Sequence, residues 1–129
     1  MNYRKAYLLI SAVALTPVAL SYGVVPELSL GWLFGISVDV PNGAHIFRGI
    51  MGLYLGMAAL WILGAMNERY ERAAILSEIF FMSGLALGRL LSVLVDGQPH
   101  WLLVGYIVVE VVLAVAGIAL LRRGDVVSR

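Results

Sequence analysis

The sequence contains no cysteine and few charged residues. Of its 129 residues, 13% are Asp, Glu, Lys or Arg, and the formal net charge at pH 7 is +1. The absence of cysteine excludes disulfides, thiolate metal sites, iron–sulfur clusters and redox-active thiols, and it leaves the redox compartment open. A net charge this close to zero provides no basic face for nucleic acid, so no nucleic-acid partner is expected.

Hydrophobic residues, in contrast, make up 61% of the chain. A soluble domain normally has about a quarter charged residues, so this chain has too little polar surface to coat a soluble globule of its length. The same figures exclude a disordered chain, because disorder needs low hydrophobicity and high charge. The composition therefore predicts an integral membrane protein.

The apolar residues form four blocks, over residues 6–25, 46–66, 73–95 and 101–121. Each block is about 20 residues long, which at a rise of about 1.5 Å per residue matches the hydrocarbon core of a bilayer. Strands of a membrane β-barrel would be about half as long and would alternate in polarity. We expect a single transmembrane domain over residues 1–129, folded as an all-α bundle of four transmembrane helices.

The first block has some features of a signal peptide. Arg4 and Lys5 precede its apolar run, and residues 19–21 (Ala-Leu-Ser) resemble a cleavage site. The apolar run continues past that site to Val25, so we expect the block to be retained as a helix. Pro17 removes one intrahelical hydrogen bond and is expected to kink this helix.

The connections between the blocks differ in length. Residues 67–72 and 96–100 form short polar connections, which make the second, third and fourth helices antiparallel neighbours. The outer loop over residues 26–45 is longer and contains Trp32 and Phe34. Two interpretations remain open: an interfacial or partly re-entrant segment over one mouth of the bundle, which would suit a function, or an apolar loop resting on lipid headgroups.

Lys and Arg are distributed unevenly along the chain. One side of the predicted bundle has seven of them, whereas the other has only Arg48 at its border. The seven are Arg4, Lys5, Arg69, Arg72, Arg122, Arg123 and Arg129. Because cytoplasmic loops are enriched in Lys and Arg, both termini are predicted to be cytoplasmic. We expect a multi-pass protein of the bacterial inner (plasma) membrane.

The third helix carries three ionisable residues on one face. Glu78, Arg89 and Asp96 are separated by 11 and 7 residues. These spacings bring the three within about 20° of each other around the helix. A charge at mid-bilayer costs at least about 2.5 kcal/mol, so this face should point into the bundle or a wet cavity. Glu78 lies nearest the cytoplasmic end, where we expect it to reach Arg72 or water.

Glu110 on the fourth helix offers a partner for Arg89. Arg89 lies about 10 Å and Glu110 about 13 Å below the outer boundary, and the two helices are adjacent, so we predict an ion pair between them. In a structural interpretation this pair, with Arg48 paired to Asp96 or Asp39, locks the bundle. In a functional interpretation the charges line an outward-facing pocket, because charges inside a membrane commonly mark a functional site.

The candidate ligand-binding residues all fall in the predicted outer half. They are Arg48, Arg89, Ser92, Asp96, Glu110, His45 and His100. Haem or metal ligation would require the two histidines to converge, which nothing in the sequence indicates, so we expect no metal and specify no cofactor. We assign no catalytic residue, because the chain has no Ser-His-Asp order, P-loop, Rossmann glycine fingerprint or HExxH motif.

Glycines recur at four-residue spacing in two of the predicted helices. Gly52 and Gly56 form one GxxxG pattern, and Gly84 and Gly88 form another. Small residues at this spacing let helix backbones approach closely in lipid. We interpret both patterns as packing within the bundle rather than as a dimer interface.

The stretches RGIMGLYLG (residues 48–56) and GLALGRLLSVLVDGQP (residues 84–99) resemble small bacterial four-helix membrane proteins known as a domain of unknown function. A more distant likeness is to the DoxX-like group. The resemblance covers most of the chain after the first loop. It implies a four-helix membrane fold but no activity, and it implies that six residues belong to the family pattern: Arg48, Arg89, Ser92, Asp96, Gly97 and Pro99.

Three classes of function remain open. The first is a protein that binds a lipid, quinone or similar amphiphile in a polar pocket of the outer half. The second is an accessory or structural subunit of a larger membrane protein complex. The expected partners are membrane lipids, and both such a complex and a homo-oligomer remain open. The third is either a small isomerase-type enzyme using Glu110, Asp96 or His100 for proton transfer, or a proton-coupled transporter relying on Glu110. Whether the protein is an enzyme stays open.

Overall fold

The computed structural model describes residues 2–127 and is all-helical over that range. The helices are α1 (Tyr3–Gly23), α2 (Pro26–Phe34), α3 (Asn42–Met66), α4 (Glu68–Asp96) and α5 (Trp101–Val127). Four of them, α1, α3, α4 and α5, are long and apolar enough to cross a membrane. The predicted all-α transmembrane bundle is confirmed, and the chain is a multi-pass membrane protein. Arg129, counted above among the cytoplasmic cations, lies outside the described residues.

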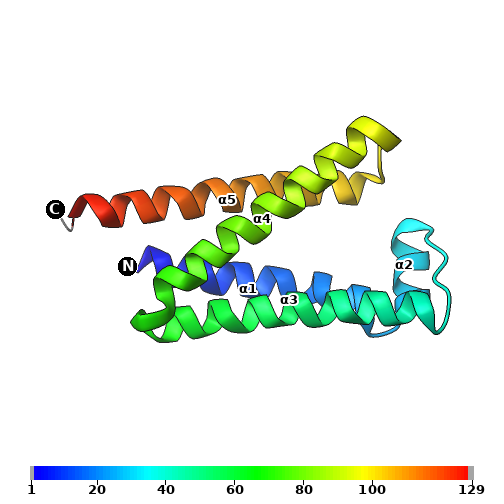
Figure 1. Ribbon diagram of the computed structural model, residues 1–129, viewed down its shortest axis with the longest axis horizontal. Coiled ribbons are helices and arrows are strands. Elements are labelled where there is room, and N and C mark those ends of the chain that lie inside the picture. Colours follow the sequence, from blue (N-terminus) through cyan, green and yellow to red (C-terminus); the bar gives the residue numbers. More distant parts are fainter. Residues whose placement is uncertain (1, 128–129) are drawn as a thin grey trace.

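The four spanning helices run up and down in chain order (Figure 1). Helix α1 packs against α3, α4 packs against α5, and contacts between α3 and α4 join the two pairs. The N-terminal start of α1, the α3–α4 turn and the C-terminal part of α5 lie together at one end of the bundle, which we call the terminal end (Figure 1). Helix α2 and the α4–α5 turn lie at the other end, which we call the α2 end.

The α3–α4 connection is shorter than the sequence indicated. Residues 67–72 were expected to form a turn, but only Asn67 lies between the two helices. The Asn67 side chain accepts a hydrogen bond from the Arg69 backbone N–H, which caps α4 at its start. Glu68 and Glu71 then lie in the first turn of α4, where the helix dipole favours negative charge. The charged residues 68–72 therefore belong to α4, which begins before the apolar block.

The long connection between α1 and α3 contains a helix that the sequence analysis missed. Helix α2 begins at Pro26, whose fixed φ suits a first helical position, and it ends at Gly35 in the left-handed conformation with φ 68°. Leu30 is buried, whereas Leu28 and Trp32 are 70% and 86% exposed. In Figure 1, α2 stands across the direction of α1 and α3 at the end of the bundle.

The interior between α1, α3 and α4 is built mainly from apolar side chains. Leu8, Trp61 and Ile75 are fully buried between α1, α3 and α4. The indole N–H of Trp61 donates a hydrogen bond of 3.1 Å to the Ser77 hydroxyl. At Gly64 a β-carbon would collide with Ala74, so this glycine permits the close approach of α3 and α4.

The GxxxG glycines, in contrast, point away from the rest of the bundle. A β-carbon at Gly52, Gly56, Gly84 or Gly88 would meet nothing within 4 Å. The prediction that they pack within the bundle is therefore wrong. On α3 the buried residue between the two glycines is Tyr54, and at about 100° per residue its neighbours two positions away lie on the opposite face.

Candidate functional site

A cavity of about 210 Å³ lies between the four spanning helices. Its polar lining comes from all four: Ser11 of α1, Tyr54 of α3, Arg89 of α4, and Tyr106 and Glu110 of α5. The other lining residues are apolar, among them Leu85 and Leu113. The cavity thus combines an apolar wall with a small number of polar groups, as small-molecule sites commonly do.

Two of these polar residues, Arg89 and Glu110, form an ion pair. The Arg89 Nε donates a hydrogen bond of 2.9 Å to Glu110 Oε1, because the antiparallel α4–α5 hairpin brings both residues to the same depth. The guanidinium also lies 5.4 Å from the ring centroid of Tyr106. Glu110 is 6% exposed, and its second oxygen, Oε2, has no hydrogen-bond partner in the described part of the chain. One carboxylate oxygen is therefore held by Arg89, and the other is free to accept a hydrogen bond.

Arg89 and Glu110 are the only two of the seven predicted ligand-binding residues in the lining of this cavity. Ser92 shares a smaller groove of about 80 Å³ with Arg89 and Pro99. The Ser92 hydroxyl donates a hydrogen bond of 2.8 Å to Asp96 Oδ2, and both residues are exposed. Asp96, the last residue of α4, is exposed, whereas Glu78 is fully buried and Arg89 is half-buried, so the predicted face is enclosed by the bundle along only part of its length.

Arg48 and His45 lie elsewhere, at the start of α3. Together with Glu27 they line a separate surface hollow of about 220 Å³. The Arg48 Nε donates a hydrogen bond of 3.2 Å to the Gly23 carbonyl, whereas the structural interpretation had paired Arg48 with Asp96 or Asp39. A cation at the last carbonyls of a helix is favourable, so Arg48 stabilises the end of α1.

His100 is placed just before α5, away from His45. Its Nδ1 accepts a hydrogen bond of 3.2 Å from the Leu102 backbone N–H, so it caps α5. Its ring lies 5.8 Å from that of Phe34, which joins α2 to the α4–α5 turn. The structure does not bring the two histidines together. Within residues 2–127, no group of three or more His, Asp and Glu side chains has a geometry that would hold a metal ion.

A group of buried polar side chains lies on the terminal side of the cavity, and the sequence had indicated only one of them, Glu78. Glu78 is fully buried beside Tyr7 and Ser11 of α1, so the expectation that it reaches Arg72 or water is wrong. The Tyr7 hydroxyl donates a hydrogen bond of 2.7 Å to the Leu113 carbonyl. A usable signal was present: Tyr7 and Ser11 are four residues apart, on one face of an otherwise apolar block.

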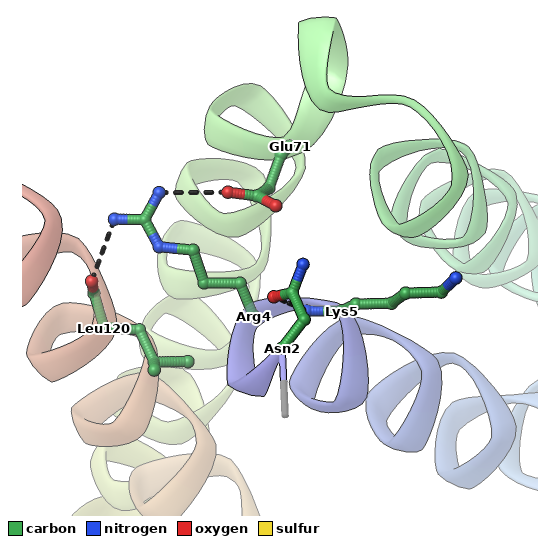
Figure 2. Close-up of polar contacts among 5 residues, drawn as sticks. All are labelled: Asn2, Arg4, Lys5, Glu71 and Leu120. Atoms are coloured by element: carbon green, nitrogen blue, oxygen red, sulfur yellow. Dashed lines mark hydrogen bonds and ion pairs between the residues drawn. The ribbon is translucent and has the colours of Figure 1, made fainter.

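At the terminal end, an arginine ties three helices together (Figure 2). Arg4 of α1 donates from Nη1 to Glu71 of α4 at 3.0 Å and from Nη2 to the Leu120 carbonyl of α5 at 3.1 Å. Lys5 points away from this contact in Figure 2. A β-carbon at Gly124 would collide with the Arg4 guanidinium, so the glycine makes room for it. This contact closes the terminal end of the bundle.

Comparison with known proteins gives one match. The model of a family described as "Domain of unknown function (DUF4345)" matches residues 3–121, a range that includes every residue lining the cavity. No curated protein and no solved structure matches the chain.

Proposed function

The chain belongs to the family described as a domain of unknown function (DUF4345), and we propose that it binds a small amphiphile in the cavity between its spanning helices. The observation that carries this proposal is the buried Glu110 Oε2, an acceptor without a partner among the described residues, beside an apolar wall. A buried acceptor without a hydrogen bond costs about 1–3 kcal/mol of stability, and a hydrogen bond from a ligand hydroxyl or amine would remove that cost.

The cavity volume limits the part of the ligand that is buried. An apolar cavity of about 150 Å³ holds one benzene molecule. The cavity of about 210 Å³ therefore suits one substituted ring or a short branch of chain. A lipid or a quinone meets this limit if one ring or headgroup enters the cavity and its tail lies in the bilayer.

The polar groups set the chemistry of the buried part. Glu110 Oε2 would accept from a hydroxyl of the ligand, and the Arg89 guanidinium has further N–H groups for a carbonyl or hydroxyl oxygen. The apolar residues around them favour a ring or chain over a sugar or a free anion. A quinol-type or hydroxylated lipid head fits both requirements.

Substitution of the cavity wall tests this proposal. Leu85 lines the cavity, whereas Leu87 on the same helix is 67% exposed and faces away from the bundle core. We expect Leu85→Trp to fill the cavity and to reduce a co-purifying small molecule by about tenfold, equivalent to about 1.4 kcal/mol of binding. Mass spectrometry of an organic extract of the purified protein, normalised to protein, measures that molecule.

Leu87→Trp is the matched control, since it adds the same side chain to the outer face of α4. It should retain the molecule at the wild-type level. An extract from wild-type protein that contains only the detergent and bulk lipids would contradict ligand binding. Equal retention in both tryptophan variants would place the ligand outside the cavity.

A second candidate function, an accessory subunit or self-associating protein, is favoured by the outward glycines. Gly52 and Gly56 on α3 leave open space where another spanning helix would approach closely. We expect Gly52→Ile/Gly56→Ile to abolish association of the protein with its partner or with itself. Native electrophoresis of mildly solubilised membranes measures this, with Leu53→Ile as the control on the same helix. A wild-type protein that migrates as a lone monomer would contradict this candidate.

A further inference from the structure

Glu78 is a carboxyl group buried within a membrane-spanning helix. It is 0% exposed, and neither of its oxygens has a hydrogen-bond partner among residues 2–127. It lies ten residues into α4, about 15 Å from the start of that helix. The nearest cations on α4, Arg72 and Arg89, are six and eleven positions away, about two and three helical turns.

Among residues 2–127, no cation of the neighbouring helices makes a hydrogen bond with Glu78. The titratable group beside it on α1 is Tyr7, whose hydroxyl donates a hydrogen bond to the Leu113 carbonyl. Arg4, one turn before Tyr7, is paired with Glu71. On α5, the buried Glu110 is paired with Arg89. On α3, His45 and Arg48 lie near the α2 end, and Tyr54 lies at the middle of the helix.

An ionised carboxylate in this position would be costly. Removing an unpaired carboxylate from water costs several kcal/mol even after the protein relaxes, and such groups bind a proton instead. The neutral acid has an O–H donor, and the adjacent Ser11 hydroxyl is fully buried and lacks a partner in the described chain. A hydrogen bond between the two would satisfy both groups.

Ser11 also connects Glu78 to the cavity. Glu78 itself does not line the cavity, whereas Ser11 does, as does Met82 one turn further along α4. We propose that Glu78 is a proton-binding site inside the membrane, reached from the interhelical cavity through the Ser11 hydroxyl. This site does not depend on the amphiphile proposed above.

The exchange of the Glu78 proton requires only Ser11 and water. The Glu78 O–H bond breaks as Ser11 Oγ takes the proton, and Ser11 releases its own proton to a water molecule in the cavity. The reverse sequence returns a proton, or in heavy water a deuteron, to Glu78. Ser11 is unchanged at the end of each cycle.

Infrared spectroscopy of the purified protein in a detergent without ester groups tests the protonation state. We expect a carbonyl band of a protonated carboxylic acid that is absent in Glu78→Gln and present in Glu110→Gln. Glu78→Asp keeps an acid at this position, so a retained but displaced band in that variant assigns the signal even if Glu78→Gln folds poorly. A wild-type protein without this band would overturn the proposal.

The rate of the deuterium shift of the same band tests the route. After transfer to heavy water, we expect Ser11→Ala to slow the shift at least about tenfold, which corresponds to about 1.4 kcal/mol of barrier. Ser21→Ala is the matched control, because Ser21 lies on the same helix and its hydroxyl donates to the nearby Val18 carbonyl, away from Glu78. Wild-type exchange in Ser11→Ala would show that protons reach Glu78 by another path and would overturn the route.

Discussion

At the scale of single residues, the molecule is distinguished by polar atoms that its spanning helices bury. Arg89 and Glu110 satisfy one another at 2.9 Å, and Arg89 also lies over the Tyr106 ring. Glu78 has no such partner in the described chain. Burial of each of these charged groups costs free energy of desolvation. The effect of a substitution on stability therefore depends on whether it leaves a buried charge unpaired.

The Arg89–Glu110 pair leads to a stability prediction. We expect Arg89→Ala to destabilise the bundle by about 3–5 kcal/mol, because it leaves Glu110 buried without its cation. The double variant Arg89→Leu/Glu110→Leu should recover most of that loss, since it removes both charges and keeps apolar volume. Unfolding in mixed detergent micelles, followed by circular dichroism, measures the difference.

The same double variant separates the two roles of the pair. If the pair only stabilises the bundle, the folded double variant should retain the co-purifying small molecule. Under our proposal it folds and loses that molecule, because Glu110 Oε2 is gone. A double variant as unstable as Arg89→Ala would show that the pair supports the fold in a way that apolar packing does not replace.

At the scale of the elements, α2 is the least expected feature. Its nine residues are too few to show a helical period beside the apolar blocks, so propensity at its two ends decides it. Pro26 starts it and Gly35 stops it. The contact of Phe34 with His100 then links α2 to the α4–α5 turn. Leu28 and Trp32 remain exposed on its outer side, where they would contact the lipid interface.

Two glycines of the α2 region test this account. Gly35 has a φ of 68°, so Gly35→Ala should destabilise the protein by about 1 kcal/mol. Gly31 lies inside α2, where an added β-carbon would make only ordinary contacts, so Gly31→Ala should be neutral or slightly stabilising. Thermal unfolding of the two variants, measured side by side, should show a lower Tm for Gly35→Ala and an unchanged or slightly higher Tm for Gly31→Ala. An equal loss in both would contradict the left-handed cap.

At the scale of the whole molecule, positive charge is concentrated at the terminal end. Arg4, Lys5, Arg69 and Arg72 lie there, on α1 and at the start of α4 (Figure 1). An excess of Lys and Arg marks the cytoplasmic side of a membrane protein. We propose that the terminal end is cytoplasmic, that the α2 end faces outward, and that the membrane is the bacterial plasma membrane.

Cysteine labelling tests this orientation, because the chain has no cysteine of its own to give background. In intact cells, a membrane-impermeant maleimide should label Ser37→Cys and Gln98→Cys, which lie in exposed connections at the α2 end. Glu68→Cys, exposed at the α3–α4 turn, should react only after the cells are opened. The opposite labelling pattern would contradict this proposal and would place the terminal end outside the cell.

The sequence by itself determined the class, the four spanning helices and the charge asymmetry, because these follow from composition, from runs of apolar residues and from the hydrocarbon thickness. It also indicated that Arg89 and Glu110 would meet, since depth along two adjacent antiparallel helices can be counted in residues. Local patterns were sufficient for these conclusions.

Only the tertiary structure decided which side of each helix faces inward. The rotation and crossing of helices depend on packing between segments far apart in the chain, so residue spacing along one helix does not reveal them. That packing turned Gly52 and Gly56 outward, left Asp96 exposed and enclosed Glu78 beside Ser11. It also opened the cavity to which four separate helices each contribute a polar side chain.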